Sequence, residues 1–280
     1  MKKIITYLIF ILKAICFAQE SGDLYADKYL SNALFRNKNI QNIDLSYKSI
    51  HIFPKKTCLF SELLTLDLSY NVINEITDSI SELKKVKLIN LSTNSLANLP
   101  ASFFNIISIE KLYLSQNHFK KIPSSIGNLI NLKDLDLSHN PIVSLPKTMS
   151  KLNKLESLDI GNTFVIQIPK VIFKIKNLEY LSFRGLKIEL ISKSILKLRK
   201  LKTLDLTATS IKSIPLFIFK LRTLEKLSLN MTSICEIPKE ISNLKNLKNL
   251  VLSDTPLASY STKINELKLL LPNCKIKITR

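Results

Sequence analysis

The sequence predicts an α/β solenoid, in which similar repeats stack and each contributes one strand and one helical turn. Three observations lead to this fold class. Apolar residues recur in three columns with an unbroken period of 23 residues over ten units, which start at Ile40, Leu63 and so on to Leu247. Apolar residues alternate at the start of each unit, as in a strand. In most units a proline follows, and then apolar residues three apart, as in a helical or 3₁₀ turn.

The composition excludes several classes of function. The 280 residues are 46% hydrophobic and 22% charged, which is enough for one folded core. The four glycines lie far apart, so a phosphate-binding glycine loop of the Walker or dinucleotide type cannot form. Three histidines and four cysteines leave little for a metal or thiol site, and we expect no cofactor. The net charge of +19 fits an anionic partner, or simply solubility.

Residues 1–18 resemble a secretory signal peptide. Two lysines precede a nine-residue apolar run, Ile4 to Leu12, and the small residue Ala18 follows. This pattern predicts cleavage and export, to the outside, the periplasm or the cell surface. The run is too short to cross a bilayer, which needs about 20 apolar residues. Lys13 interrupts the apolar region. It keeps open the alternative of a retained segment on a cytoplasmic protein.

The remaining chain divides into a cap, the repeats and a second cap. Residues 19–39 are polar with apolar residues at helical spacing, so we expect an N-terminal capping helix. Residues 40–269 contain the ten 23-residue repeats. Within the last of them, residues 261–271 predict a final helix. Residues 270–280 predict a C-terminal capping strand.

The repeat unit carries a family resemblance. One unit reads Leu132-x-x-Leu135-x-Leu137-x-x-Asn140-x-Ile142-x-x-Leu145-Pro146. The chain resembles leucine-rich repeat proteins of the 23-residue type, including bacterial repeats and those of Ras-pathway scaffolds and plant disease-resistance-like proteins. The resemblance covers residues 40–280. It implies a right-handed horseshoe with a parallel sheet on the concave face and short α or 3₁₀ helices on the convex face.

The ninth position of each unit carries a structural side chain in this family. The family has Asn there, whose amide bonds backbone groups that the turn leaves unpaired. The units that fit carry Asn71, Asn94, Asn117 and Asn140. Four later units have Thr instead. Leu186 departs altogether, and its unit also has Ser192 where most units have proline. We therefore expect a less regular, more weakly bonded turn around Leu186.

The third, fifth and seventh positions of each unit should line the concave face, because strand neighbours of buried residues point the other way. Six Asp and three cations over these thirty positions make the face mildly acidic, at −3. The candidate binding residues on this face are Asp67, Tyr113, Asp134, Asp136, Asp159, Tyr180, Arg184 and Asp205. We predict a groove for a protein or peptide with basic segments, in which the two tyrosines act as anchors. A solvated sheet without a ligand is the simpler alternative.

Lysines gather on the opposite, convex side. A basic ridge is formed at 23-residue spacing by Lys151, Lys174, Lys197 and Lys220. Because like charges ~5 Å apart repel by only about 0.8 kcal/mol in water, a solvated face explains them without a ligand. The alternative function is a surface adhesin that binds acidic glycans or lipid headgroups through this ridge. We expect no nucleic-acid partner, because no aromatic side chains interleave with the lysines.

Apolar residues lie between the lysines of this ridge. They are Val171, Phe173, Leu196, Leu216, Phe217 and Phe219. They form either an exposed patch, which would mark a contact with a partner or a membrane, or contacts between neighbouring helices.

Catalysis finds no support in the sequence. His51, His118 and His139 occupy different repeat positions, and no nucleophile or paired carboxylate is placed beside them. A Ca²⁺ ion shared by aligned aspartates is a weak alternative, and we expect no metal. The sequence thus favours a non-enzymatic exported module that binds a protein or peptide. It does not fix the oligomeric state.

Overall fold

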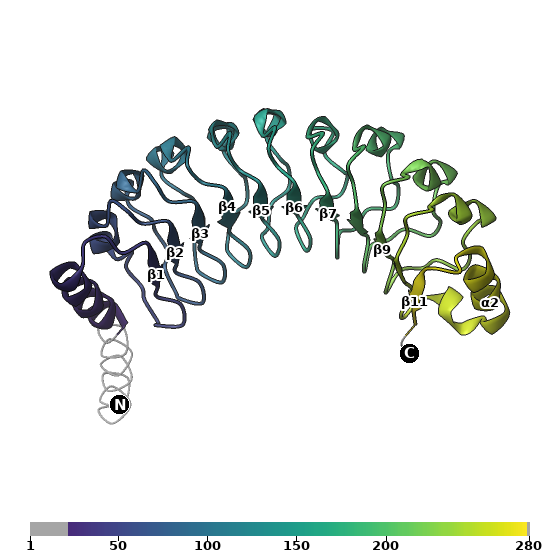
Figure 1. Cartoon of the computed structure of the whole chain (residues 1–280), viewed down its shortest axis with the longest axis horizontal. Helices are drawn as coiled ribbons and strands as arrows, with labels where there is room; N and C mark the ends of the chain where they lie inside the picture. Colours follow the sequence, from purple (N-terminus) through teal and green to yellow (C-terminus); the bar gives the residue numbers. More distant parts are fainter. Residues whose placement is uncertain (1–21, 279–280) are drawn as a thin grey trace, which may run out of the picture. The chain divides into compact units, whose positions relative to one another are not determined.

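In the computed structural model, residues 22–278 are described, and the chain divides into two compact units, Met1–Phe119 and Lys120–Arg280. We describe each unit by itself. In both units every repeat is one turn of the solenoid, with a strand on one side and a short helix on the other (Figure 1). The expected signal peptide over residues 1–18 lies outside the described residues.

Unit 1 begins with a helix whose described part covers residues 22–36. Four strands follow: β1 (Asn42–Asp44), β2 (Thr65–Asp67), β3 (Leu88–Asn90) and β4 (Lys111–Tyr113). The 3₁₀ helices between them are η1 (Lys55–Leu59), η2 (Asp78–Glu82) and η3 (Ala101–Asn105). The strands pair in parallel, and partners lie one period apart, so that Ile43 faces Leu66.

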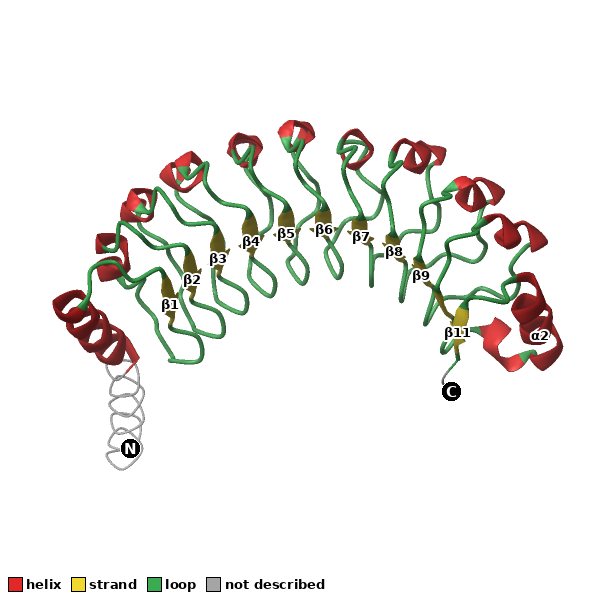
Figure 2. Cartoon of the chain, in the orientation of Figure 1, coloured by secondary structure: helices red, strands yellow, loops and turns green. Residues whose placement is uncertain are grey.

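Unit 2 contains seven further strands: β5 (Asp134–Asp136), β6 (Ser157–Asp159), β7 (Tyr180–Ser182), β8 (Thr203–Asp205), β9 (Lys226–Ser228), β10 (Asn249–Val251) and β11 (Lys275–Lys277). Its helices are η4 (Ser124–Asn128), η5 (Lys147–Lys151), η6 (Ile172–Lys174), η7 (Lys193–Lys197), η8 (Leu216–Lys220), η9 (Lys239–Asn243), η10 (Pro256–Ser259) and α2 (Ser261–Leu270). Its strands also pair in parallel (Figure 2).

The predicted α/β solenoid is confirmed: parallel strands and short helices alternate in both units. The core is made by the three apolar columns, and successive members such as Leu135, Leu158 and Leu181 are fully buried. A single repeat cannot enclose these side chains, so neighbouring repeats must stack on each other.

Proline sets the start of most of the 3₁₀ helices. Pro123 and Pro146, for example, precede η4 and η5 with φ of −70°, a value that the proline ring favours. In the repeat with Ser192, the serine side chain instead accepts a hydrogen bond from the backbone N–H of Ser194. The helix η7 keeps its full five residues.

The turn around Leu186 is more regular than expected. The Gly185 N–H donates to the Thr207 carbonyl at 2.8 Å, and the Leu186 N–H donates to Phe183 at 3.1 Å. The expectation of a less regular backbone here was therefore wrong, although Leu186 contributes no side-chain hydrogen bond. The shortened helix of this region is η6, which has three residues and belongs to the preceding repeat.

The eighth position of every repeat adopts a left-handed backbone conformation, which the sequence did not reveal. The residues concerned, with φ between 52° and 69°, are Tyr47, Tyr70, Thr93, Gln116, His139, Asn162, Gly185, Ala208, Met231 and Asp254. Only one of them is glycine, the residue that adopts this conformation without steric cost. The stacking of the repeats therefore holds the other nine in a disfavoured conformation.

The ninth-position Asn side chains link the repeats through buried hydrogen bonds. The Asn94 Nδ2 atom donates to the carbonyls of Leu68, Leu91 and Ser92 at 2.9, 3.2 and 3.3 Å. Its Oδ1 atom accepts from the Ile73 N–H at 2.9 Å. One amide thus pairs backbone groups of two repeats that would otherwise be buried without partners.

Threonine at the same position makes fewer bonds. The Thr163 hydroxyl donates to the Ile160 carbonyl at 2.8 Å, and Thr209 and Thr232 repeat this contact in their own units. Each of these bonds stays within one repeat. The side chain of Thr therefore closes the turn without joining it to the neighbouring repeat.

Most of the apolar residues between the lysines pack between helices. Val171, Phe173 and Phe219 are buried, Leu196 and Phe217 are half-buried, and Leu216 alone is exposed. The alternative of one exposed apolar patch was therefore wrong.

We predict that Asn94→Ala lowers the free energy of unfolding by about 2–4 kcal/mol, because it leaves buried carbonyls and the Ile73 N–H unpaired. Urea unfolding followed by circular dichroism measures the change. The matched control is Asn98→Ala, at an exposed Asn of the same repeat. Equal stability of the two variants would contradict the structural role given to Asn94.

Candidate functional site

The strand face of unit 2 is the side on which the third- and fifth-position side chains of β5–β8 lie. The register places Asp136 on β5 opposite Asp159 on β6, and places Ser182 on β7 between Asp159 and Asp205 on β8. Tyr180 lies at the start of β7, opposite Ser157. The structure thus gathers these predicted residues on four neighbouring strands, and each is partly exposed except the buried Ser182.

Each fifth-position aspartate also has a structural role, which sequence reasoning missed. The Oδ1 atom of Asp136 accepts from the Ser138 N–H at 2.9 Å. Asp159 accepts in the same way from Gly161 at 2.7 Å, and Asp205 from Thr207 at 2.9 Å. These are Asx-type turns, which the recurring Asp-x-Ser spacing could have indicated. One carboxylate oxygen shapes the turn, and the carboxylate keeps its charge at the face.

The seventh-position side chains mostly do not line this face, contrary to expectation. Ser138, Thr207 and Ser253 are buried, as is Ser69 in unit 1, because the chain turns inward at the end of each strand. Arg184 is the exposed exception. The strand face therefore consists of third- and fifth-position residues, with Arg184 beside β7.

Negative charge accumulates around Asp159. Burial raises the pKa of this carboxyl, and the charges of Asp136 and Asp205 raise it further, against the lowering effect of the Gly161 N–H. The Tyr180 hydroxyl lies 3.5 Å from Asp159 Oδ2. Burial, followed by the Asp159 charge, raises the pKa of Tyr180 to about 12. A cationic group that reached this cluster would relieve the repulsion between the carboxylates.

Three further predicted residues lie on the strand faces of the two units. Asp134 is half-buried at the start of β5. In unit 1, Asp67 uses one oxygen for Ser69 and the other for the Asn90 amide, at 3.0 Å. Tyr113 is half-buried at the end of β4.

Unit 1 also exposes an aromatic pair that the sequence analysis did not single out. Tyr47 and Tyr70 stack with their ring centroids 4.1 Å apart, and both are exposed. They share the eighth repeat position, so the 23-residue period itself could have indicated that they are neighbours.

The four ridge lysines end neighbouring helices of unit 2: Lys151 in η5, Lys174 in η6, Lys197 in η7 and Lys220 in η8. All four are exposed, and none forms an ion pair with a described residue.

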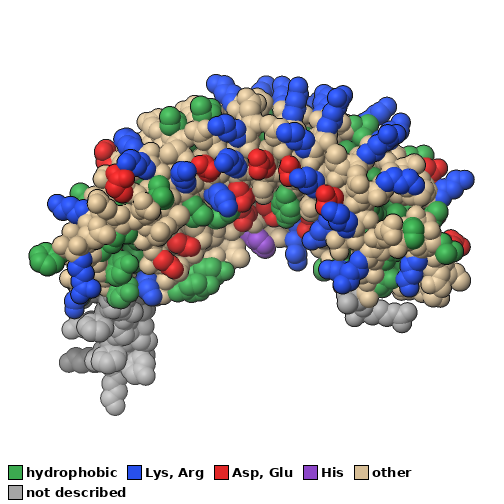
Figure 3. Space-filling view, in the orientation of Figure 1, with side chains coloured by type: hydrophobic (Ala, Val, Ile, Leu, Met, Phe, Trp, Pro, Cys, Tyr) green, Lys and Arg blue, Asp and Glu red, His purple; other side chains and the backbone are tan. Residues whose placement is uncertain are grey.

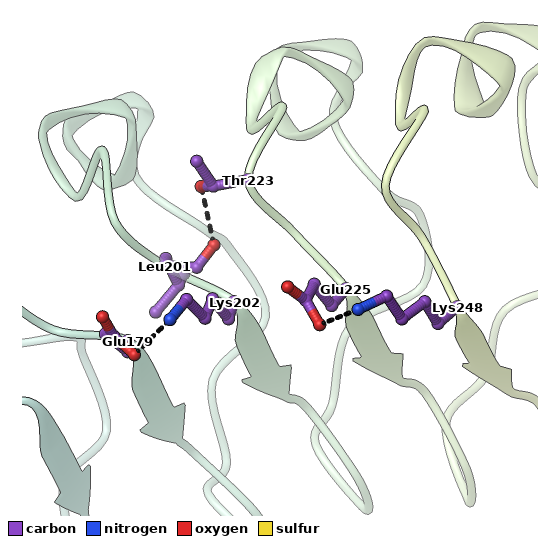
Figure 4. A network of polar contacts seen from close by, with 6 residues as sticks. All are labelled: Glu179, Leu201, Lys202, Thr223, Glu225 and Lys248. Carbon is purple, nitrogen blue, oxygen red and sulfur yellow. Dashed lines mark hydrogen bonds and ion pairs between the residues drawn. The ribbon is translucent and has the colours of Figure 1, made fainter.

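Lysines at the second repeat position differ from the ridge lysines, because charges of opposite sign follow each other there from Glu179 to Lys248. Lys202 pairs with Glu179 at 2.6 Å, and Lys248 with Glu225 at 2.7 Å (Figure 4). These contacts raise the pKa of Lys202 and lower the pKa of Glu225.

Residues 22–278 show no group of three His, Cys, Asp or Glu side chains that could hold a metal ion. In the same range, no helix has the length and apolar character needed to cross a membrane. His139 contacts the Asn162 amide at 3.0 Å, and Cys58, Cys235 and Cys274 are free thiols.

Comparison with known families matches most of the repeat region. A leucine-rich repeat model matches residues 107–165, and a leucine-rich repeat region model matches residues 170–271. The chain is a leucine-rich repeat protein. No curated protein matches this leucine-rich repeat chain.

Solved structures similar to this leucine-rich repeat protein come from bacteria and plants. A leucine-rich repeat protein of Leptospira interrogans shares 26% identity with a TM-score of 0.66, over 86% of this chain and 72% of that one. The Arabidopsis receptor kinase HAESA, solved with the peptide hormone IDA and the co-receptor SERK1, shares 28% with a TM-score of 0.67. The match covers 78% of this chain and 38% of that one.

A third similar structure is the ectodomain of the Arabidopsis receptor kinase GASSHO1/SCHENGEN3, solved in complex with CASPARIAN STRIP INTEGRITY FACTOR 2. It shares 25% identity with a TM-score of 0.65, over 86% of this chain and 29% of that one. The matches therefore cover only about a third of each of these two plant chains.

We predict that Asp159→Asn stabilises the fold at pH 7 by about 0.2–1 kcal/mol, the usual cost of like charges across strands. The Asn side chain keeps an oxygen for the Gly161 N–H and removes the repelling charge. Because the folded-state pKa of Asp159 is raised, wild-type stability falls as pH rises from the ordinary value of 3.8 through the raised one. The advantage of the variant should therefore disappear at pH 3.

Thermal unfolding at the two pH values measures this difference. The control is Asp254→Asn, at an exposed aspartate away from the cluster. A loss of stability in Asp159→Asn at pH 7 would contradict the repulsion between these carboxylates.

Proposed function

We propose that this protein is an exported, non-enzymatic module that binds a protein or peptide carrying a basic segment. The binding surface is the strand face of unit 2, with the carboxylates of Asp136, Asp159 and Asp205 as its charged centre and Tyr180 as an aromatic anchor. Asp134 and Arg184 form the margins of this surface. Asp67 and Tyr113 belong to the strand face of unit 1, and we propose them as binding residues of that unit.

The raised pKa of Asp159 is the observation that carries this proposal. The shift comes first from burial and then from the charges of Asp136 and Asp205. None of the three carboxylates forms an ion pair with a described residue, so the cluster lacks a compensating cation. A Lys or Arg of a ligand would supply that cation and form charge-assisted hydrogen bonds with the carboxylates. The similar plant receptors, solved with a peptide hormone in one case, support a peptide as the type of ligand.

The fold itself suits this role. All ten third-position residues and all of the strand-face aspartates belong to hydrogen-bonded three-residue strands, so their backbone is held in place before a ligand arrives. A preorganised surface loses less conformational freedom on binding. Arg184, at the margin, would select against ligands that are basic throughout, because it repels a cation.

We predict that the triple variant Asp136→Asn, Asp159→Asn and Asp205→Asn loses binding about tenfold or more. A random peptide library displayed on phage and selected on the wild-type protein should yield peptides enriched in Lys and Arg. Fluorescence polarisation of the selected peptides then compares the variants. Asn keeps an acceptor for each Asx turn, so the substitution tests the charge and leaves the turns in place.

The matched control removes the same charge outside the strand face, with Glu189→Gln, Glu236→Gln and Glu266→Gln. It should bind within about twofold of wild type, because distant exposed charges are screened by salt. Equal binding by the wild-type protein and the Asp triple variant would overturn the site.

Export is proposed from residues 1–18, with the helix over residues 22–36 as the cap of the mature stack. The mature protein recovered from its native cells should begin at Gln19, and N-terminal mass spectrometry measures this. A chain that retains Met1 would instead support the cytoplasmic alternative.

A further inference from the structure

We propose that an open hollow between η6 and η7 binds a linear acidic polysaccharide, and that it does so independently of the strand face. The hollow has a volume of about 960 Å³. Six of its ten lining residues are cations: Lys174, Lys176, Lys193, Lys197, Arg199 and Lys200. None of its lining residues is acidic.

The hollow lies beside η6, which is shorter than the neighbouring helices. The helix η6 has three residues, whereas η5, η7 and η8 have five each. The lining of the hollow combines the apolar side chains of Phe173 and Leu196 with the six cations.

The six cations line the hollow together, and no acidic side chain lines it with them. All six are exposed, and none forms an ion pair with a described residue. The second repeat position shows the opposite arrangement, because Glu179 pairs there with Lys202 and Glu225 pairs with Lys248. In the hollow, like charges follow at 23-residue intervals instead, as in Lys174 with Lys197 and Lys176 with Arg199. An anion in this space relieves that repulsion and gains several charge-assisted contacts.

The shape of the basic surface favours a linear polymer. Lys151 on η5 and Lys220 on η8 flank the hollow along the stacking direction, so the ridge continues past both of its ends. Figure 3 shows Lys and Arg side chains gathered along the side of the repeats where the helices lie. A chain of carboxylate or sulfate groups laid along this side meets a cation at each successive repeat.

The lining residues favour a polysaccharide over other polyanions. Phe173 is 3% exposed, so no aromatic ring is available for the base stacking on which single-stranded nucleic-acid sites depend. Leu196 is half-buried, so the hollow presents no protruding apolar side chain for insertion into a bilayer. Asn177 and Ser194 add polar groups suited to sugar hydroxyls.

Heparin and polygalacturonate serve as sulfated and carboxylated probes, titrated calorimetrically against the full chain from about 50 to about 200 mM NaCl. The hollow variant carries Lys174→Gln, Lys197→Gln and Arg199→Gln. The matched control carries Lys187→Gln, Lys212→Gln and Lys268→Gln, three exposed lysines of unit 2 outside the hollow.

We expect wild type to bind at least one of the two probes with an affinity that falls steeply with salt. The hollow variant should lose about tenfold or more in affinity, and its log–log salt slope should be shallower by about 2, since each cation contributes 0.7–0.9. The control should stay within about twofold of wild type. The Asp136/Asp159/Asp205 triple variant should bind the probes as wild type does.

Other outcomes overturn the proposal. Equal losses in the hollow variant and the control would show that net charge alone attracts the probe. Tighter binding of an oligothymidine than of both probes would assign the surface to nucleic acid. Tighter binding of phosphatidylserine vesicles would assign it to a membrane, and absence of binding to both probes would leave no polysaccharide site. Circular dichroism of each variant verifies that the fold is kept, as expected for substitutions at exposed side chains.

Discussion

The structure depends on the fact that no repeat can satisfy its own backbone. A three-residue strand has hydrogen-bond partners only on its neighbours, and the turn after it leaves further carbonyls and N–H groups unpaired. Stacking at a constant 23-residue offset resolves both problems, because each strand group then meets its counterpart in the next repeat. The Asn94 amide, which bonds backbone groups of two repeats, shows how a side chain completes this pairing.

The same constraint explains what the sequence could and could not predict. The period fixed the fold class and the placement of Asp136, Asp159 and Asp205 on neighbouring strands, because stacking converts sequence spacing directly into spatial position. It did not reveal that seventh-position side chains such as Ser138, Thr207 and Ser253 are buried, since strand alternation was extended past the end of the three-residue strands. Nor did it reveal the left-handed backbone conformation of the eighth position. Glycine, the residue that would have indicated this conformation, occurs there only once.

The 23-residue period also could not predict local departures from the regular repeat. The absence of proline before η7 suggested an irregular turn, but the Ser192 hydroxyl provides the missing start signal. The shortening of η6 has no counterpart in the apolar pattern, and the hollow beside it was therefore not predicted. The basic ridge was identified from spacing, whereas the hollow that six cations line became apparent only in the structure.

Opposite charges occupy the two sides of unit 2. The strand face holds carboxylates on rigid neighbouring strands, while the helix side holds unpaired cations on separate helical turns. Neither the carboxylates of Asp136, Asp159 and Asp205 nor the six cations of the hollow form ion pairs with described residues. At the second repeat position, in contrast, Glu179 pairs with Lys202 and Glu225 with Lys248. The two sides thus offer complementary surfaces on one scaffold, one for a cationic ligand and the other for an anionic one.

The eighth repeat position forms a third surface, with a constant backbone conformation and variable side chains. Its backbone conformation is imposed by the stack, while side chains such as Tyr47, Tyr70 and Met231 extend into solvent. Ten repeats hold nine different residue types there, from tyrosine to aspartate. Residues at this position can therefore be substituted one at a time without changes in the core. The rim is thus the part of the scaffold that can vary most easily during evolution.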